Sequence, residues 1–73
     1  MDPTACFKRC LEAIDECDWT ELRYAVEDLR KWLMLGGFPP EQFARCGEHA
    51  GMICRMVLRG MYELCDGGRV YEG

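Results

Sequence analysis

A chain of 73 residues can form one small domain, and an apolar content of 49% favours a folded chain over a disordered one. The net charge is −4 and the pI is about 4.8, which argues against non-specific nucleic-acid binding because that depends on excess lysine and arginine. The sequence shows neither a secretion signal nor an apolar run long enough for a membrane helix. With Met1 as the natural start, we expect a cytoplasmic protein with reduced thiols.

The first predicted helix covers residues 3–16. Asp2 followed by Pro3 is typical of a helix start, because aspartate caps the free N–H groups and proline fits the first turn. Apolar residues then recur at helical spacing. They are Phe7, Cys10, Leu11, Ile14 and Cys17.

The second predicted helix covers residues 19–35. Asp18, with Glu21 three residues later, resembles a capping box. Gly36 and Gly37 mark the end of the helix, since glycine readily adopts the left-handed conformation found there. One apolar stripe runs between these signals: Leu22, Ala25, Val26, Leu29, Trp32 and Leu33.

The stretch 13–21 joins these two helices, and within it Asp18 and Trp19 form an Asp-aromatic pair. This stretch resembles the inter-helix corner of tetratricopeptide-type hairpins, in which such a pair often starts the second helix. Cys17 occupies the place of the usual glycine, and the sequence contains no second repeat. The resemblance implies an antiparallel helical hairpin.

The third predicted helix is long and covers residues 40–65, with a loose tail over 69–73. Phe38-Pro39-Pro40 makes a rigid turn before it, and Gly67-Gly68 ends it. Two short connections favour an up-down-up order of helices. We therefore predict an all-α fold, a three-helix up-down-up bundle with a long third helix, in a single domain over residues 1–68.

The predicted core is the union of the three apolar stripes, because the apolar face of each helix is buried by packing against the other two. Its members are Phe7, Leu11, Ile14, Leu22, Ala25, Leu29, Trp32, Leu33, Phe43, Ala50, Ile53, Val57 and Met61.

Six cysteines in so short a chain leave three interpretations. Free cysteine packs as a small hydrophobe, and this interpretation suits a cytoplasmic protein best. Disulfides are the second. Cys6 and Cys10 lie one helical turn apart, too far to bond to each other, so bridges would join either of them to Cys46, or Cys17 to Cys54. Cys65 has no evident partner and would link two chains.

A metal site is the third interpretation. Cys6 and Cys10 place two thiols on one helix face, and Cys46 with His49 places a thiol and an imidazole on another. Together these four side chains would offer ligands to zinc, and cysteine- and methionine-rich helices also bind Cu(I). We expect no cofactor, with zinc or copper as the alternative.

The sequence contains no recognisable catalytic group. It has no serine, no phosphate-binding glycine loop, and only one histidine, His49, whose helical neighbours supply no nucleophile. We therefore predict that the protein is not an enzyme.

One predicted surface combines arginines with methionines, a composition found at protein interfaces. In addition, the third helix is longer than its neighbours, and its apolar stripe continues to the end. An exposed stripe of that length favours a homodimer. The predicted interface residues are Arg45, His49, Met52, Met56, Leu58, Arg59, Met61 and Leu64.

These features favour a small helical protein-protein interaction module, homo-oligomeric and without catalytic activity. Its partner is another protein, with no binding to nucleic acid or membrane. A cysteine-based metal-binding or thiol-redox helical protein is the first alternative. A small phage or mobile-element inhibitor of a host protein is the second, because small acidic bundles suit that role.

Overall fold

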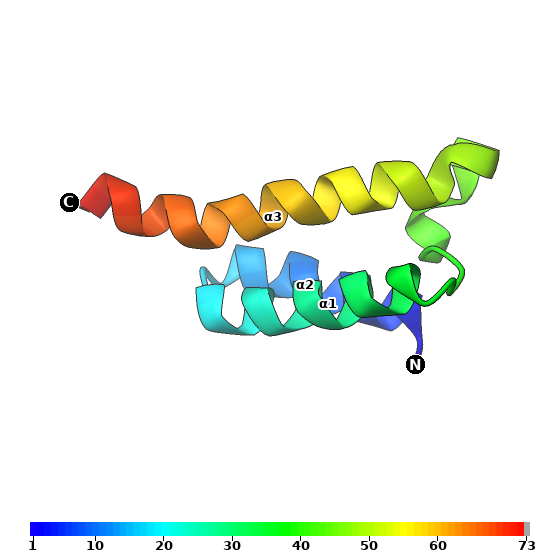
Figure 1. Ribbon diagram of the computed structural model, residues 1–73. Helices are drawn as coiled ribbons and strands as arrows, with labels where there is room; N and C mark the ends of the chain where they lie inside the picture. Colours follow the sequence, from blue (N-terminus) through cyan, green and yellow to red (C-terminus); the bar gives the residue numbers. More distant parts are fainter. Residues whose placement is uncertain (73) are drawn as a thin grey trace.

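The computed structural model describes the backbone of residues 1–72 and the side chains of residues 1–65. Within that part all regular secondary structure is helical. Helix α1 covers Pro3–Asp15, α2 covers Trp19–Met34, the 3₁₀ helix η1 covers Glu41–His49, and α3 covers Ala50–Glu72. Helices α1 and α2 form an antiparallel hairpin, and α3 runs back along it in the direction of α1 (Figure 1). The predicted all-α, three-helix up-down-up bundle with a long third helix is confirmed.

Aspartates start both helices of the hairpin, as predicted. The Asp2 carboxylate accepts hydrogen bonds from the N–H groups of Thr4 at 3.0 Å and Ala5 at 3.3 Å. The Asp18 carboxylate accepts one from the N–H of Glu21 at 3.1 Å. Each bond satisfies an N–H group that the helix itself leaves without an acceptor. Both helices consequently begin and end within one residue of their predicted bounds.

The same backbone motif ends both helices of the hairpin. After α1, Cys17 has a left-handed φ of 54° and its N–H bonds to the Ile14 carbonyl, while the N–H of Asp18 reaches the Ala13 carbonyl. After α2, Gly36 has a φ of 87°, and two equivalent bonds reach Leu33 and Trp32. This pattern of two hydrogen bonds is the Schellman motif, which normally has glycine at the left-handed position. Cysteine at position 17 is the exception.

The third helix differs from its prediction over residues 40–65. Residues 41–49 form η1, and α3 begins only at Ala50. The break lies at Gly47, whose φ of 59° and ψ of −130° are accessible to glycine and to essentially no other residue. At the other end α3 continues to Glu72, so the tail predicted to be loose over 69–73 is helical to that residue, and Gly73 lies outside the described part.

Contacts from Thr4 and Phe7 hold the start of η1 against the start of α1. The Thr4 hydroxyl accepts a hydrogen bond from the N–H of Glu41 at 3.0 Å, and Gln42 donates to the Thr4 carbonyl at 3.2 Å. The rings of Phe7 and Phe43 meet edge to face at 5.0 Å. The 3₁₀ helix thus closes the end of the bundle at which α1 begins.

Helix α3 extends past the hairpin at its C-terminal end (Figure 1). Its 23 residues span roughly 35 Å at 1.5 Å per residue, compared with roughly 24 Å for the 16 residues of α2. The molecule is elongated as a result, with extents of 40 × 21 × 18 Å.

The core contains most of the predicted residues, but Leu11 is 46% exposed and was wrongly assigned. Five other predicted members, namely Ile14, Trp32, Leu33, Ile53 and Val57, are half-buried at its edge. The buried residues of α3, all on its apolar stripe, are Ala50, Cys54, Leu58, Met61 and Cys65. The complete buried set is Cys6, Phe7, Cys10, Ala13, Leu22, Ala25, Val26, Leu29, Phe43, Ala50, Cys54, Leu58, Met61 and Cys65.

Candidate functional site

The predicted metal ligands do not come together. Cys6 and Cys10 are buried in the core, Cys46 is half-buried, and the exposed His49 lies beside Glu48, with Nε2 3.6 Å from its carboxylate. Among the residues whose side chains the structure describes, no three acidic, histidine or cysteine side chains are grouped to hold a metal ion. The four-ligand zinc set is therefore not assembled in this fold.

The buried thiols are also poorly suited to redox or metal chemistry. Burial raises the pKa of Cys10 to about 12, with the neighbouring Cys6 adding to the shift, and burial raises the pKa of Cys54 to about 11. Burial likewise raises the pKa of Cys6, which Arg9 partly opposes. Because the thiolate is the nucleophile and the metal ligand, a protonated thiol has little reactivity at neutral pH.

All six cysteines are free thiols, and several pack as the hydrophobes of the first interpretation. Cys6 donates a hydrogen bond from its thiol to the Ala25 carbonyl at 3.3 Å, which joins α1 to α2. Cys65, expected to link two chains, is only 6% exposed, and its sulfur lies 3.5 Å from the Trp19 carbonyl. Cys17 is the exposed cysteine.

Two of the predicted interface residues are buried. Leu58 is 1% exposed and Met61 is 7% exposed, so both belong to the core. Arg45 and His49 are exposed but lie on η1, before α3 begins. The remaining four, Met52, Met56, Arg59 and Leu64, are exposed on α3.

An uncharged ridge of exposed residues runs along α3. Met52, Met56, Gly60 and Leu64 are spaced four residues apart, and all four are exposed. The three side chains are 52%, 66% and 48% exposed, respectively. Residues at this spacing line up along a helix surface and pack into the grooves of a neighbouring helix. We call these four residues the α3 ridge.

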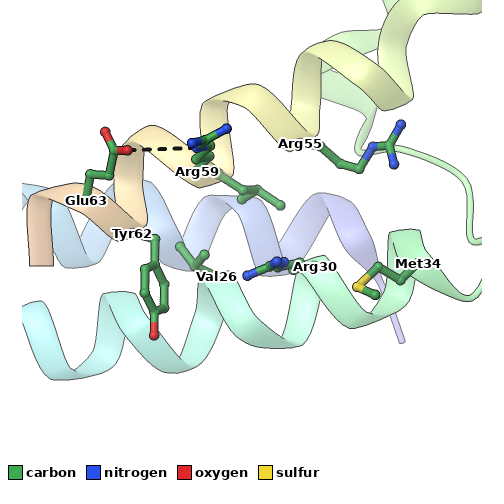
Figure 2. Close-up of a pocket in the computed structure, with 8 residues that line it drawn as sticks. Val26, Arg30, Met34, Arg55, Arg59, Tyr62 and Glu63 are labelled. Carbon is green, nitrogen blue, oxygen red and sulfur yellow. Dashed lines mark ion pairs between the residues drawn. The ribbon is translucent and has the colours of Figure 1, made fainter. Parts of the chain in front are cut away.

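A groove with a volume of about 620 Å³ lies along the surface where α2 and α3 meet (Figure 2). Its floor is apolar, formed by the buried Val26 and Leu58. The remaining lining residues are Arg30 and Met34 from α2, and Arg55, Arg59, Tyr62 and Glu63 from α3. We call this the arginine groove.

The arginine groove was not predicted from the sequence, although Arg59 is one of the predicted interface residues. The groove combines residues from two helices, and their meeting depends on which side of α2 faces α3. One sequence signal was available. Arg55 and Arg59 lie four residues apart on one helix, a spacing at which like charges repel.

Neither the comparison with protein-family models nor the searches of curated proteins and of solved structures found a match to this chain. Over the described residues, no helix combines the length and the apolar character needed to cross a membrane.

Proposed function

We propose that this protein is a non-catalytic protein-binding module that forms a homodimer through the α3 ridge. The observation that carries the proposal is the unbroken line of exposed, uncharged residues from Met52 to Leu64. Such a line on the surface of a monomer would leave large apolar side chains in water over three turns. We further propose that the protein acts in the cytoplasm, where thiols such as Cys6 remain reduced.

The composition of the ridge suits close helix packing. A Cβ atom built on Gly60 would meet no atom within 4 Å, so this position is an open notch in the surface. Met52 and Met56 are unbranched and polarizable, and they adapt to irregular partner surfaces. When ridges of this spacing from two helices interlock, the helices cross at about −50°, the commonest arrangement in globular proteins.

A bulky side chain at the notch tests the dimer. Light scattering with reductant present should give about twice the chain mass of 8.4 kDa, and Gly60→Gln should shift the protein to the monomer mass. Gly51→Gln is the matched control. It adds the same side chain to the same helix, also where no atom lies within 4 Å, but off the ridge, and should leave the dimer intact.

Two results contradict the proposal. A monomer mass of the unchanged protein at micromolar concentration would rule out the homodimer. Dissociation by Gly51→Gln as strongly as by Gly60→Gln would place the interface elsewhere on α3.

A further inference from the structure

The arginine groove carries uncompensated positive charge in an acidic protein. Three arginines line it against the single carboxylate of Glu63, whereas the whole chain has a net charge of −4. The pair of Arg59 with Glu63 spans 3.8 Å between two strongly exposed side chains, so it offsets little. Arg30 and Arg55 form no ion pair with any side chain that the structure describes.

On another face of the protein, Arg9 is paired with acidic side chains. The Arg9 guanidinium bonds to the Glu21 carboxylate and lies 3.9 Å from that of Asp28, so it is shared between two acids. Arg30 and Arg55 differ from Arg9, because both line the groove without a carboxylate partner in the part of the chain that the structure describes. Guanidinium groups at the rim of such a groove bind carboxylates through two parallel hydrogen bonds.

The ends of the groove are apolar or aromatic. Met34 lies at the end near Arg55, and Tyr62 reaches from α3 toward α2 at the other (Figure 2). The guanidinium of Arg23 lies 5.5 Å from the centre of the Tyr62 ring, a cation–π contact that orients the ring. The groove therefore offers an apolar slot between two end walls, with positive charge along its edges.

We propose that the arginine groove binds an acidic amphipathic segment of a partner protein. Apolar side chains of that segment would pack on the exposed Met34 and on the Tyr62 ring, above the closed floor of the groove. Its carboxylates would reach Arg30 and Arg55. This proposal rests on the protein-binding role but uses a surface other than the ridge. Two copies of the chain cannot pair groove to groove about a two-fold axis, because each arginine set would face the other. Nucleic acid fits less well, since the net charge of −4 repels phosphates and the floor is apolar.

The test uses a fluorescein-labelled peptide of 15 residues, with leucines along one helical face and glutamates four residues apart on both flanks. Fluorescence anisotropy should show binding that weakens as salt rises. A peptide with glutamine in place of every glutamate should bind at least tenfold more weakly. Arg30→Gln and Arg55→Gln should each weaken binding of the acidic peptide at least fivefold.

Arg45→Gln is the matched control. Arg45 is exposed, forms no ion pair with the described side chains, and lies on η1 outside the groove, so its loss changes the net charge equally. It should change the affinity less than twofold. The monomeric Gly60→Gln variant should bind the peptide as the parent does, which separates this proposal from the homodimer.

Five results overturn the proposal. The first is no binding of the acidic peptide, and the second is equal binding of the glutamine peptide. The third is an equal loss on Arg45→Gln. The fourth is tighter, Arg55-dependent binding of a labelled DNA duplex. Glu16→Gln tests whether a second copy of this chain occupies the groove, because Glu16 lies among the acidic residues where α1 meets α2. The fifth result is a rise in peptide affinity on this change, which would show that a second copy of the chain fills the groove.

Discussion

At the scale of single residues, the two helix ends of the hairpin form a natural comparison. Both have the same pair of backbone hydrogen bonds, but one has cysteine and the other glycine at the left-handed position. An L-residue with a side chain pays an energy of about 1–2 kcal/mol in this conformation, whereas glycine adopts it freely. Position 17 therefore stores strain that position 36 does not.

We predict that Cys17→Gly stabilises the protein by about 0.5–1 kcal/mol, the relief of strain less the added entropy of the unfolded chain. Gly36→Ala should destabilise it by about 1 kcal/mol for the reverse reason. Urea unfolding measures both. Cys17→Ala is the control, because it removes the exposed thiol but keeps the strain, and should change stability by less than about 0.5 kcal/mol. A gain from Cys17→Ala equal to that from Cys17→Gly would show that the thiol, not the strain, is responsible.

The buried thiols make stability sensitive to alkaline pH. The folded-state pKa is about 12 for Cys10 and about 11 for Cys54, above the value of 9.0 expected in the unfolded chain. The folded state therefore retains protons that the unfolded state releases. This contribution is fully present below pH 9.0 and is lost as the pH rises toward these folded-state values.

We accordingly predict a lower free energy of unfolding at about pH 10 than at about pH 7. Tyrosine and lysine also titrate in this range, so a variant isolates the thiol. Cys54→Ala should be less stable than the parent at about pH 7, because it leaves a cavity, and should lose less stability on going to about pH 10. The same pH dependence in both proteins would argue against a buried thiol at position 54.

At the scale of elements, the limits of prediction are clearest at Gly47. The starts of α1 and α2 were predictable because Asp2 and Asp18 are caps with a recognisable pattern around them. The break before α3 was not, because Phe43, Cys46 and Ala50 keep helical spacing across it. Glycine within a helix costs only about 1 kcal/mol, so its presence alone does not predict a break.

The exposed residues of the candidate site could be predicted only in part, because which residues of α3 face solvent depends on how α3 packs against α2. Met52, Met56 and Leu64 were correctly expected on the surface, since they lie opposite or beside the buried stripe. Leu58 and Met61 are buried and so do not belong to the exposed surface of α3, and for Met61 this agrees with its place in the predicted core. The arginine groove depends on the same contact between helices, which periodicity within one helix does not determine.

We predict that Gly47→Ala destabilises the protein by about 1–3 kcal/mol, because alanine must enter a conformation essentially reserved for glycine. Gly51→Ala is the matched change inside α3. It meets no atom within 4 Å and improves helix propensity, so it should stabilise the protein by about 0.5–1 kcal/mol. Chemical denaturation compares the two. Stabilisation by Gly47→Ala would mean that residues 40–65 prefer one continuous helix.

At the scale of the whole molecule, α2 holds the bundle together because it packs against both of the other long helices. Leu29 is fully buried on α2, and its neighbours Ala25 and Val26 are buried as well. We predict that Leu29→Ala costs about 2–5 kcal/mol, the lost burial plus the cavity left behind. A domain of this size has a total stability of only about 5 kcal/mol, so the variant should retain only about 0–3 kcal/mol and unfold at a much lower urea concentration.

Circular dichroism in rising urea tests this prediction, with Leu11→Ala as control. Leu11 is 46% exposed on α1, so the same truncation there should cost less than about 1 kcal/mol.

The proposed homodimer makes the stability depend on protein concentration as well. If subunits associate through the α3 ridge, a tenfold rise in protein concentration raises the urea midpoint of the parent, because association favours the folded state by mass action. The monomeric Gly60→Gln variant should show no such rise. In that monomeric variant, a loss of less than about 1 kcal/mol on Leu29→Ala would show that α2 does not form the centre of the core.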